Sequence, residues 1–292
     1  MSQAPAPSPE LPAEDERVEI ERVAVEVSMA AARLLVDERP HDLGVDTTKS
    51  SRSDVVTVMD LRSQDLIMER IAAARPHDAV FGEERGGVDG TGAVTWVVDP
   101  IDGTVNYLYD IPAYAVSVAA VVGDPRVPGG FTAFVGVVVN PVTGEIFRAR
   151  SGGGAWSGRP GRADERVLAA PGPDLGLALV GTGFGYAAER RRWQARVLGD
   201  LLPRVRDIRR EGGAALDLCH VATGRLDAFY ETGLNPWDLA AAWVVAREAG
   251  VVVGGLDGPE TPGPDLTWAA GPALAGPFSA AVIEATRAHR GV

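Results

Sequence analysis

Two apolar stretches near the middle of the chain most narrow the folds open to it. Residues Ala115–Val122 and Phe131–Val139 are almost wholly apolar, yet each is far shorter than the roughly 20 residues that a membrane-spanning helix needs. We therefore expect core strands of a soluble protein. Further strand signals follow at Gly144–Arg150 and Gly154–Ser157, separated by an Asn-Pro pair and a glycine run. Turn residues between strand signals predict antiparallel hairpins.

Helices are predicted on both sides of this strand-rich segment. Apolar residues at helical spacing indicate five of them, at Glu16–Glu38, Leu61–Ala74, Ala214–Ala222, Leu239–Ala249 and Phe278–His289. Gly224 and Gly250 follow two of these helices and are expected to end them. Hairpins together with separate helices favour a layered α+β architecture over a regular βαβ array.

The chain is expected to form one compact unit of two lobes behind a short tail. Its opening residues lack the basic start and the apolar stretch of a signal peptide, so residues 1–14 are predicted to be a disordered tail. A change in composition near Ser151–Arg162 predicts an N-terminal α+β lobe over residues 15–155, with most of the metal ligands described below. A C-terminal α/β lobe would cover residues 156–292.

The charge balance argues against nucleic acid as a partner. The chain of 292 residues has a net charge of -12 and no long basic run, so nucleic-acid phosphates would be repelled. A small phosphate bound by this chain would therefore need a cation. The single cysteine, Cys219, excludes an internal disulfide framework and fits a reducing cytoplasm.

Three common catalytic signatures are absent from the sequence. There is no Gly-x-x-x-x-Gly-Lys-Ser/Thr loop, no His-Glu-x-x-His pair and no Gly-x-Ser-x-Gly elbow. Lys49 is the only lysine, and the four histidines lack the spacing of metal ligands: His41, His77, His220 and His289. We interpret these histidines as solvated or packed side chains.

The most informative window is Trp96–Asn106, which reads WVVDPIDGTVN. Asp99 and Asp102 stand on either side of a proline turn, after a strand predicted at Thr95–Val98 that the proline is expected to end. Two carboxylates at this spacing can point at one cation, and the turn leaves the Ile101 carbonyl free as a neutral oxygen ligand. Hard divalent cations such as Mg²⁺ prefer an all-oxygen shell.

Other groups can complete a site around this window. Gly103 and Thr104 can begin a helix whose unpaired N–H groups would face an anion beside the metal. Glu83 follows a short apolar run and can lie at the end of a neighbouring strand. Asp238 stands at the start of the helix predicted from Leu239 and is explained independently as its N-terminal cap. Taken alone, the aspartate window could also be a capped turn, and Glu83 part of a surface turn.

Taken together and in this order, these residues resemble the motifs of the inositol monophosphatase family, and the bacterial inositol-1-monophosphatases within it most closely. The family's first signature is similar to Trp96–Tyr107, and its second is similar to Asn235–Ala241. Its Gly-Glu-Glu element resembles Gly82–Glu84, and the stretch that precedes this element in the family resembles Lys49–Asp60, which includes Asp54. The resemblance covers nearly everything beyond the tail.

The resemblance implies an α/β/α/β/α sandwich, a homodimer, and two to three Mg²⁺ ions per subunit. The metal ligands that it implies are Glu83, Asp99, the Ile101 carbonyl, Asp102 and Asp238. Asp60 and Thr104 match the pair that orients the attacking water, and Glu83 is implied in catalysis with them. The implied substrate contacts are Gly103, Thr104, Ala214, Glu231 and Asp238.

The activity implied by the resemblance is Mg²⁺-dependent, lithium-sensitive hydrolysis of inositol 1-phosphate to inositol and phosphate. The charge balance and the short apolar stretches predict no nucleic-acid or membrane partner. Phosphatases of histidinol phosphate, fructose 1,6-bisphosphate and 3'-phosphoadenosine 5'-phosphate resemble this chain at the metal site and stay open as alternatives. A binding factor for transcription or RNA maturation is the alternative from a different class. The chain departs from the family at Gly213, often Ser or Thr there, and at Asn235-Pro236, often His-Cys, so its substrate-side wall can differ.

Overall fold

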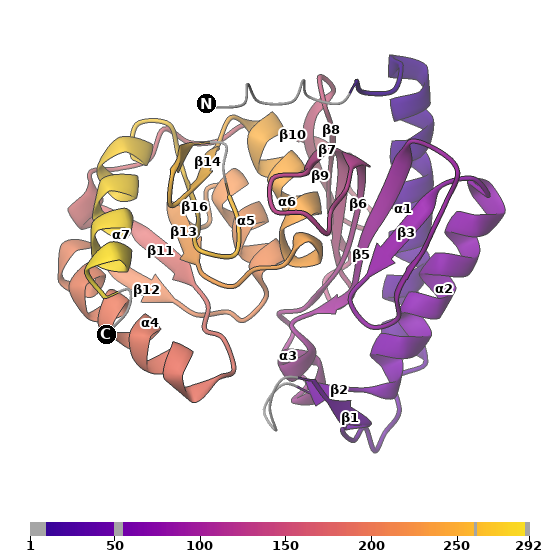
Figure 1. Ribbon diagram of the computed structural model, residues 1–292, viewed down its shortest axis with the longest axis horizontal. Helices are drawn as coiled ribbons and strands as arrows, with labels where there is room; N and C mark the ends of the chain where they lie inside the picture. Colours follow the sequence, from indigo (N-terminus) through magenta and orange to yellow (C-terminus); the bar gives the residue numbers. More distant parts are fainter. Residues whose placement is uncertain (1–9, 50–54, 260–261, 290–292) are drawn as a thin grey trace, which may run out of the picture.

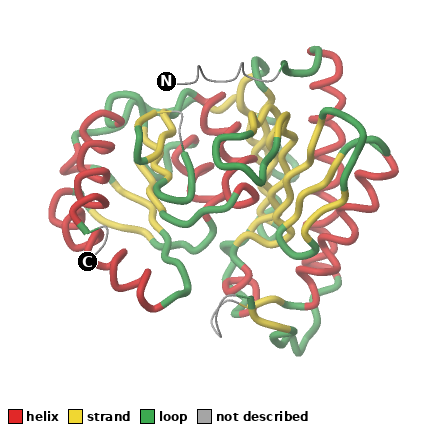
Figure 2. Tube along the Cα trace, viewed as in Figure 1, coloured by secondary structure: helices red, strands yellow, loops and turns green. Residues whose placement is uncertain are grey.

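The protein is a five-layer sandwich of helices and sheets (Figure 1). The computed structural model describes residues 10–49, 55–259 and 262–289. Its described α-helices are α1 (Glu14–Asp37), α2 (Val58–Ala74), α3 (Thr104–Leu108), α4 (Ala188–Leu201), α5 (Ala214–Ala222), α6 (Pro236–Ala249) and α7 (Ala275–Ala288). Helices α1 and α2 cover one sheet, α5 and α6 lie between the two large sheets, and α4 and α7 cover the other (Figure 2). The layered fold implied by the resemblance is confirmed.

The first large sheet has eight strands and is antiparallel except for one parallel pair, β3 with β5. Its order is β10 (Glu165–Val167), β9 (Gly154–Gly158), β8 (Glu145–Arg150), β7 (Phe131–Asn140), β6 (Ala115–Gly123), β5 (Val94–Asp102), β3 (Ala79–Gly82) and β4 (Gly86–Val88). The pairs β7 with β8 and β8 with β9 are the antiparallel hairpins predicted from the turn residues.

The second large sheet has six strands, and β11 runs parallel to both of its neighbours. Its order is β12 (Asp207–Arg209), β11 (Leu179–Thr182), β13 (Ala228–Glu231), β16 (Thr267–Ala270), β14 (Val252–Gly255) and β15 (Gly258–Pro259). A two-stranded sheet of β1 (Thr47–Thr48) and β2 (Val55–Val56) and two short 3-10 helices, Leu175–Leu177 and Leu202–Arg204, complete the described elements.

The apolar stretches are explained by helices on both faces of the first sheet. Alternate residues of β6 enter different cores: Val116 and Val118 pack toward α1 and α2, whereas Ala115 and Ala119 pack toward α5 and α6. Because successive side chains of a strand point to opposite faces, a strand that is covered on both faces must be apolar throughout. None of the described helices is both long and apolar enough to span a bilayer.

The strand predicted at Thr95–Val98 is longer than expected. It continues through Pro100 to Asp102, with Asp99 opposite Ser117 and Asp102 opposite Ala115. The expectation that the proline ends the strand was therefore wrong. The register shifts between Asp99 and Asp102, and such an irregularity lets a residue without an N–H lie in a strand, because no ladder bond is required of it there.

Two helix starts also differ from the prediction because of capping boxes. Helix α2 begins at Val58 rather than Leu61, since the Thr57 side chain caps it and Asp60 accepts a hydrogen bond from the Thr57 backbone N–H. Helix α6 begins at Pro236, and its N-cap is Asn235 rather than Asp238. Proline is favoured in the first turn, where its missing N–H costs nothing. The predicted stop at Gly250 is confirmed, because Gly250 adopts the left-handed conformation with a φ of 94°.

Candidate active site

Glu83 and Asp99 meet because β3 and β5 are parallel and end at the same edge of the first sheet. Gly82 pairs with Val98, and the Glu83 backbone N–H continues the ladder by donating to the Val98 carbonyl at 3.2 Å. The next residue on each strand is then an acid. Parallel neighbours thus bring together two carboxylates from different parts of the sequence.

The turn after Asp99 is fixed by its own side chains. The Ile101 N–H donates to Asp99 Oδ1 at 3.0 Å, and the Thr104 hydroxyl lies 3.1 Å from the Ile101 carbonyl oxygen. Gly103 precedes α3 with a φ of 93°, a backbone conformation that side chains with a Cβ rarely adopt. The predicted helix start at Gly103 and Thr104 is confirmed.

The remaining two acids are held by backbone N–H groups at the starts of α5 and α6. Asp102 Oδ2 accepts a hydrogen bond of 2.8 Å from the Ala215 N–H in the first turn of α5. Asp238 Oδ2 accepts one of 2.7 Å from the Asn235 N–H at the start of α6. Carboxylate oxygens of Asp99, Asp102 and Asp238 all lie within 4.8 Å of one another. This group and Glu83 are called the acid cluster below.

The acids of this cluster hold their protons more tightly than isolated carboxyls. Burial, and then the charge of Asp238, raises the pKa of Glu83 to about 7. Burial also raises the pKa of Asp102 and of Asp238 to about 7, although backbone N–H groups counteract it. Burial and the charges of Glu83 and Asp102 raise the pKa of Asp99 well above its usual range. Acids this close to one another can all be ionised only when cations lie beside them.

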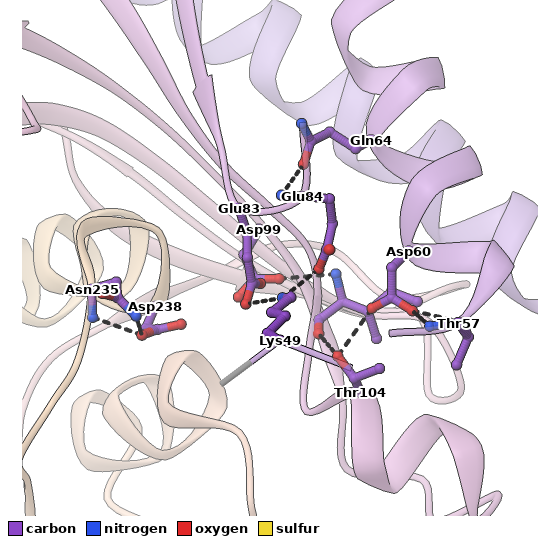
Figure 3. A network of polar contacts seen from close by, with 11 residues as sticks. Lys49, Thr57, Asp60, Gln64, Glu83, Glu84, Asp99, Thr104, Asn235 and Asp238 are labelled. Carbon is purple, nitrogen blue, oxygen red and sulfur yellow. Dashed lines mark hydrogen bonds and ion pairs between the residues drawn. The ribbon is translucent and has the colours of Figure 1, made fainter. Parts of the chain in front are cut away.

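Lys49, the only lysine, supplies one cation at the edge of the acid cluster (Figure 3). Its ammonium lies 2.6 Å from Glu83 Oε1 and 2.6 Å from Glu84 Oε1. Glu84 is held from the other side, because its N–H donates to Gln64 Oε1 of α2 at 2.8 Å. One ammonium cannot neutralise four buried acids, so the cluster has room for further positive charge. Asp54, part of the same sequence motif, lies outside the described residues.

Asp60 and Thr104 form a hydrogen-bonded pair beside the cluster (Figure 3). The Thr104 hydroxyl lies 3.0 Å from Asp60 Oδ1, and the other Asp60 oxygen accepts from the Thr57 hydroxyl at 2.6 Å and the Thr57 N–H at 2.8 Å. The capping box that starts α2 therefore also orients the Asp60 carboxyl. Burial raises the pKa of this carboxyl to about 6, against the hydrogen bonds from Thr57.

The acid cluster, Lys49 and Thr104 line a pocket of about 550 Å³ between the two large sheets. Glu231, at the end of β13, and Ala214, the first residue of α5, also line it. Gly183 makes room for Glu231, since a Cβ there would lie 2.1 Å from a Glu231 carboxylate oxygen. Burial and the charges of Asp238 and Asp102 raise the pKa of Glu231 to about 8. Among the described residues Glu231 forms no salt bridge.

Every site residue named from the sequence lines one pocket except Asp60, which is buried and hydrogen-bonded to the pocket residue Thr104. The structure adds residues that the motifs did not predict, notably Arg190 and Arg210 on the wall formed by the second half of the chain, and Asp217. An arginine in an amphipathic helix such as α4 carries no spacing signal that separates a pocket residue from a solvated one. Only the packing of α4 against Gly185 and Gly233 places Arg190 there.

Comparisons with known proteins agree with this geometry. The sequence model of the Inositol monophosphatase family matches residues 16–290. Inositol-1-monophosphatase SuhB of Mycobacterium tuberculosis is 48% identical over 219 residues, which is 72% of this chain and 71% of that protein. Nus factor SuhB of Escherichia coli is 34% identical over 238 residues, or 81% of this chain and 85% of that protein. The solved structure of Mycobacterium tuberculosis SuhB superposes with a TM-score of 0.76 at 38% identity and covers 92% of this chain and 97% of its own.

Proposed function

The chain belongs to the inositol monophosphatase family, and from that premise we propose that it is a Mg²⁺-dependent phosphomonoesterase that hydrolyses inositol 1-phosphate. The observation that carries the proposal is the acid cluster, in which carboxylate oxygens of Asp99, Asp102 and Asp238 lie within 4.8 Å of one another. The homodimer, the two to three ions per subunit and the lithium sensitivity implied by the resemblance belong to the same proposal.

The donor set of the acid cluster fits Mg²⁺. All of its donors are oxygens, from Glu83, Asp99, Asp102, Asp238 and the Ile101 carbonyl, and the hard divalent cations bind such oxygen donors. Burial first, and then the charges of neighbouring carboxylates, raise the pKa values of the four acids, and among the described residues Lys49 is the one cation that forms a salt bridge with them. When bound, the ion supplies the charge that offsets the substrate phosphate and makes water a better nucleophile.

The Asp60–Thr104 pair supplies a route for a proton. With its hydroxyl hydrogen donated to Asp60 Oδ1, the Thr104 oxygen keeps its lone pairs free to accept a proton from an attacking water. The hydroxyl is equally close to the Ile101 carbonyl oxygen, so the ionised Asp60, as the stronger acceptor, favours the productive orientation. The resemblance also assigns phosphate contacts to the backbone of Gly103 and Thr104.

The wall opposite the acid cluster suits a neutral polyol. Glu231 lines the pocket without a salt bridge among the described residues, so its carboxyl is available to hydroxyl groups of a ring. A carboxylate there disfavours a second phosphate, which favours inositol 1-phosphate over a bisphosphate. Ala214 lines the same pocket and presents no bulky side chain.

A panel of phosphate esters tests the proposal directly. Inositol 1-phosphate, histidinol phosphate, fructose 1,6-bisphosphate and 3'-phosphoadenosine 5'-phosphate would be compared at equal concentration, with Mg²⁺ and again with chelator. We expect the highest kcat/KM for inositol 1-phosphate and no turnover in chelator. Full activity in chelator would refute the metal-dependent reaction, and preference for another ester would refute the substrate alone.

A second candidate follows from the similarity to Nus factor SuhB of Escherichia coli. A factor for transcription or RNA maturation need not use the acid cluster at all. The net charge of -12 disfavours direct binding to RNA, so such a role would act through protein partners. Co-purification with RNA polymerase components at moderate salt, unchanged in a variant without catalytic activity, would support this role.

A further inference from the structure

A second group of metal-ligating side chains lies outside the acid cluster. Glu211, Asp217 and His220 each offer one ligand atom, and these atoms all lie within 4.8 Å of one another. Asp217 and His220 are three residues apart on α5, so they share one face of the helix, and Glu211 comes from the segment just before it. We propose that these three side chains bind a divalent transition-metal ion, with ligands distinct from those of the acid cluster although Asp217 also lines the pocket.

The distance between two of the ligand atoms is already that of a metal site. His220 Nδ1 lies 3.3 Å from Glu211 Oε2. Two ligands about 2.1 Å from one ion, at tetrahedral or octahedral angles, are roughly 3.0 to 3.4 Å apart. A pair at this distance can hold an ion with little movement of either side chain, and the ligand atom of Asp217 lies within 4.8 Å of both.

Asp217 provides a separate indication of a bound ion at this site. It is 1% exposed, yet its Oδ1 has no hydrogen-bond partner. Buried polar atoms are rarely left without a partner, because the loss of hydration is not compensated. Arg210 is the cation that acts on Asp217, but it forms no salt bridge with Asp217 among the described residues. A metal ion between Asp217 and the Glu211–His220 pair would satisfy this oxygen.

The imidazole distinguishes the proposed site from the acid cluster. The cluster offers only oxygen donors, which suit Mg²⁺, whereas two carboxylates and an imidazole suit Zn²⁺, Co²⁺ or Mn²⁺. Among the described residues, two arginines act on Glu211 but are paired elsewhere: Arg225 with Glu145 at 2.5 and 2.7 Å, and Arg209 with Asp207 at 2.7 Å. The ion would also join the segment before α5 to the helix whose first turn donates to Asp102.

Electron spin echo spectroscopy of the protein loaded with Mn²⁺ tests the site without measuring activity. Mn²⁺ in the acid cluster has no nitrogen ligand, so modulation from imidazole ¹⁴N reports a histidine-containing site. We expect this modulation in the wild type and in the control His41→Gln, whose histidine is exposed and remote in sequence. We expect it to disappear in His220→Gln. Absence of the modulation in the wild type, or its persistence in His220→Gln, would overturn the proposal.

A calorimetric titration adds a measure of affinity. With the acid cluster saturated by excess Mg²⁺, Zn²⁺ should bind to one additional site per chain. Asp217→Asn keeps the volume of the side chain and removes its charge, and it should weaken that site by about tenfold or more. Zn²⁺ affinity equal to that of the wild type in both Asp217→Asn and His220→Gln would show that these residues are not ligands.

Discussion

The two large sheets supply different kinds of residue to the same pocket. The first sheet provides Glu83, Asp99 and Asp102, all at the end of the adjacent strands β3 and β5. The second sheet provides Glu231, the last residue of β13, and Arg210, the residue after β12. The backbone hydrogen bonds between β3 and β5 fix the positions of Glu83 and Asp99 relative to each other. Glu231 and Arg210 come from strands that are not paired with each other, so one of them can be substituted without moving the other. The comparison suggests that the chemistry resides on the first side and substrate choice on the second.

Asp238 belongs to neither sheet, and its substitution is the sharpest test of the division between chemistry and substrate choice. It lies on α6, between the sheets, but its carboxylate belongs to the acid cluster. We expect Asp99→Asn and Asp238→Asn each to lower kcat by about three orders of magnitude or more, since each removes the charge of a proposed metal ligand and keeps its volume. Turnover with saturating Mg²⁺ is the measurement, and circular dichroism is the control for folding. A change of KM alone in Asp238→Asn would assign this residue to the substrate wall.

The next largest effect is expected at Asp60. Asp60→Asn removes the acceptor that orients the Thr104 hydroxyl, so kcat should fall by about 100-fold while KM changes little. Asp65→Asn is a matched control, because Asp65 lies on the same helix α2 but is exposed and paired with Arg85. Equal losses in the two variants would mean that α2, rather than the Asp60 carboxyl, is responsible.

Asp60 also gives the first side of the pocket a pH dependence. Burial raises its pKa from 3.8 to about 6 in the folded protein, so the folded state binds this proton more tightly than the unfolded state. The resulting stability is fully present below about pH 4 and is lost as the pH rises through about 6. In chelator, the free energy of unfolding of the wild type relative to Asp60→Asn should therefore fall over this range, by about 3 kcal/mol. A flat difference would contradict the shift.

The two sides also differed in how well the sequence predicted them. Asp99, Ile101 and Asp102 lie in one short window, so their local spacing and the family resemblance indicated the same corner. The parallel pairing of β3 with β5 that brings Glu83 to it is a long-range contact, and no local pattern encodes such a pairing. The end of β5 and the start of α6 were misplaced by a few positions, because a proline in a strand irregularity or a first helical turn is tolerated where its N–H is not needed.

The surroundings of α5 were predicted least, and His220 shows why. The scattered histidines indicated solvated or packed side chains, and the His220 ring does contact Phe147, but its ligand atom also lies within 4.8 Å of those of Glu211 and Asp217. Asp217 carries an ordinary helical spacing, and its burial is set by the packing of α5 between the two sheets. Residues that act through tertiary neighbours give no signal in a single sequence.

Glu231 offers the smallest expected effect and the most specific test of the opposite wall. Its carboxyl lines the pocket and forms no salt bridge among the described residues. The ring hydroxyls of the substrate are therefore its proposed hydrogen-bond partners. Glu231→Ala should raise the KM for inositol 1-phosphate by about tenfold, as expected for the loss of one hydrogen bond, while kcat stays within a small factor.

The control for Glu231 is the substrate itself. A simple aryl phosphate has no ring hydroxyls, so its hydrolysis should be nearly the same in the wild type and in Glu231→Ala. Glu231→Gln retains an acceptor oxygen without the charge and should fall between the two on inositol 1-phosphate. If the aryl phosphate is affected as strongly as inositol 1-phosphate, Glu231 acts on the acid cluster through Asp238 and Asp102, whose charges already raise its pKa. The separation of chemistry and substrate choice between the two sides of the pocket would then fail.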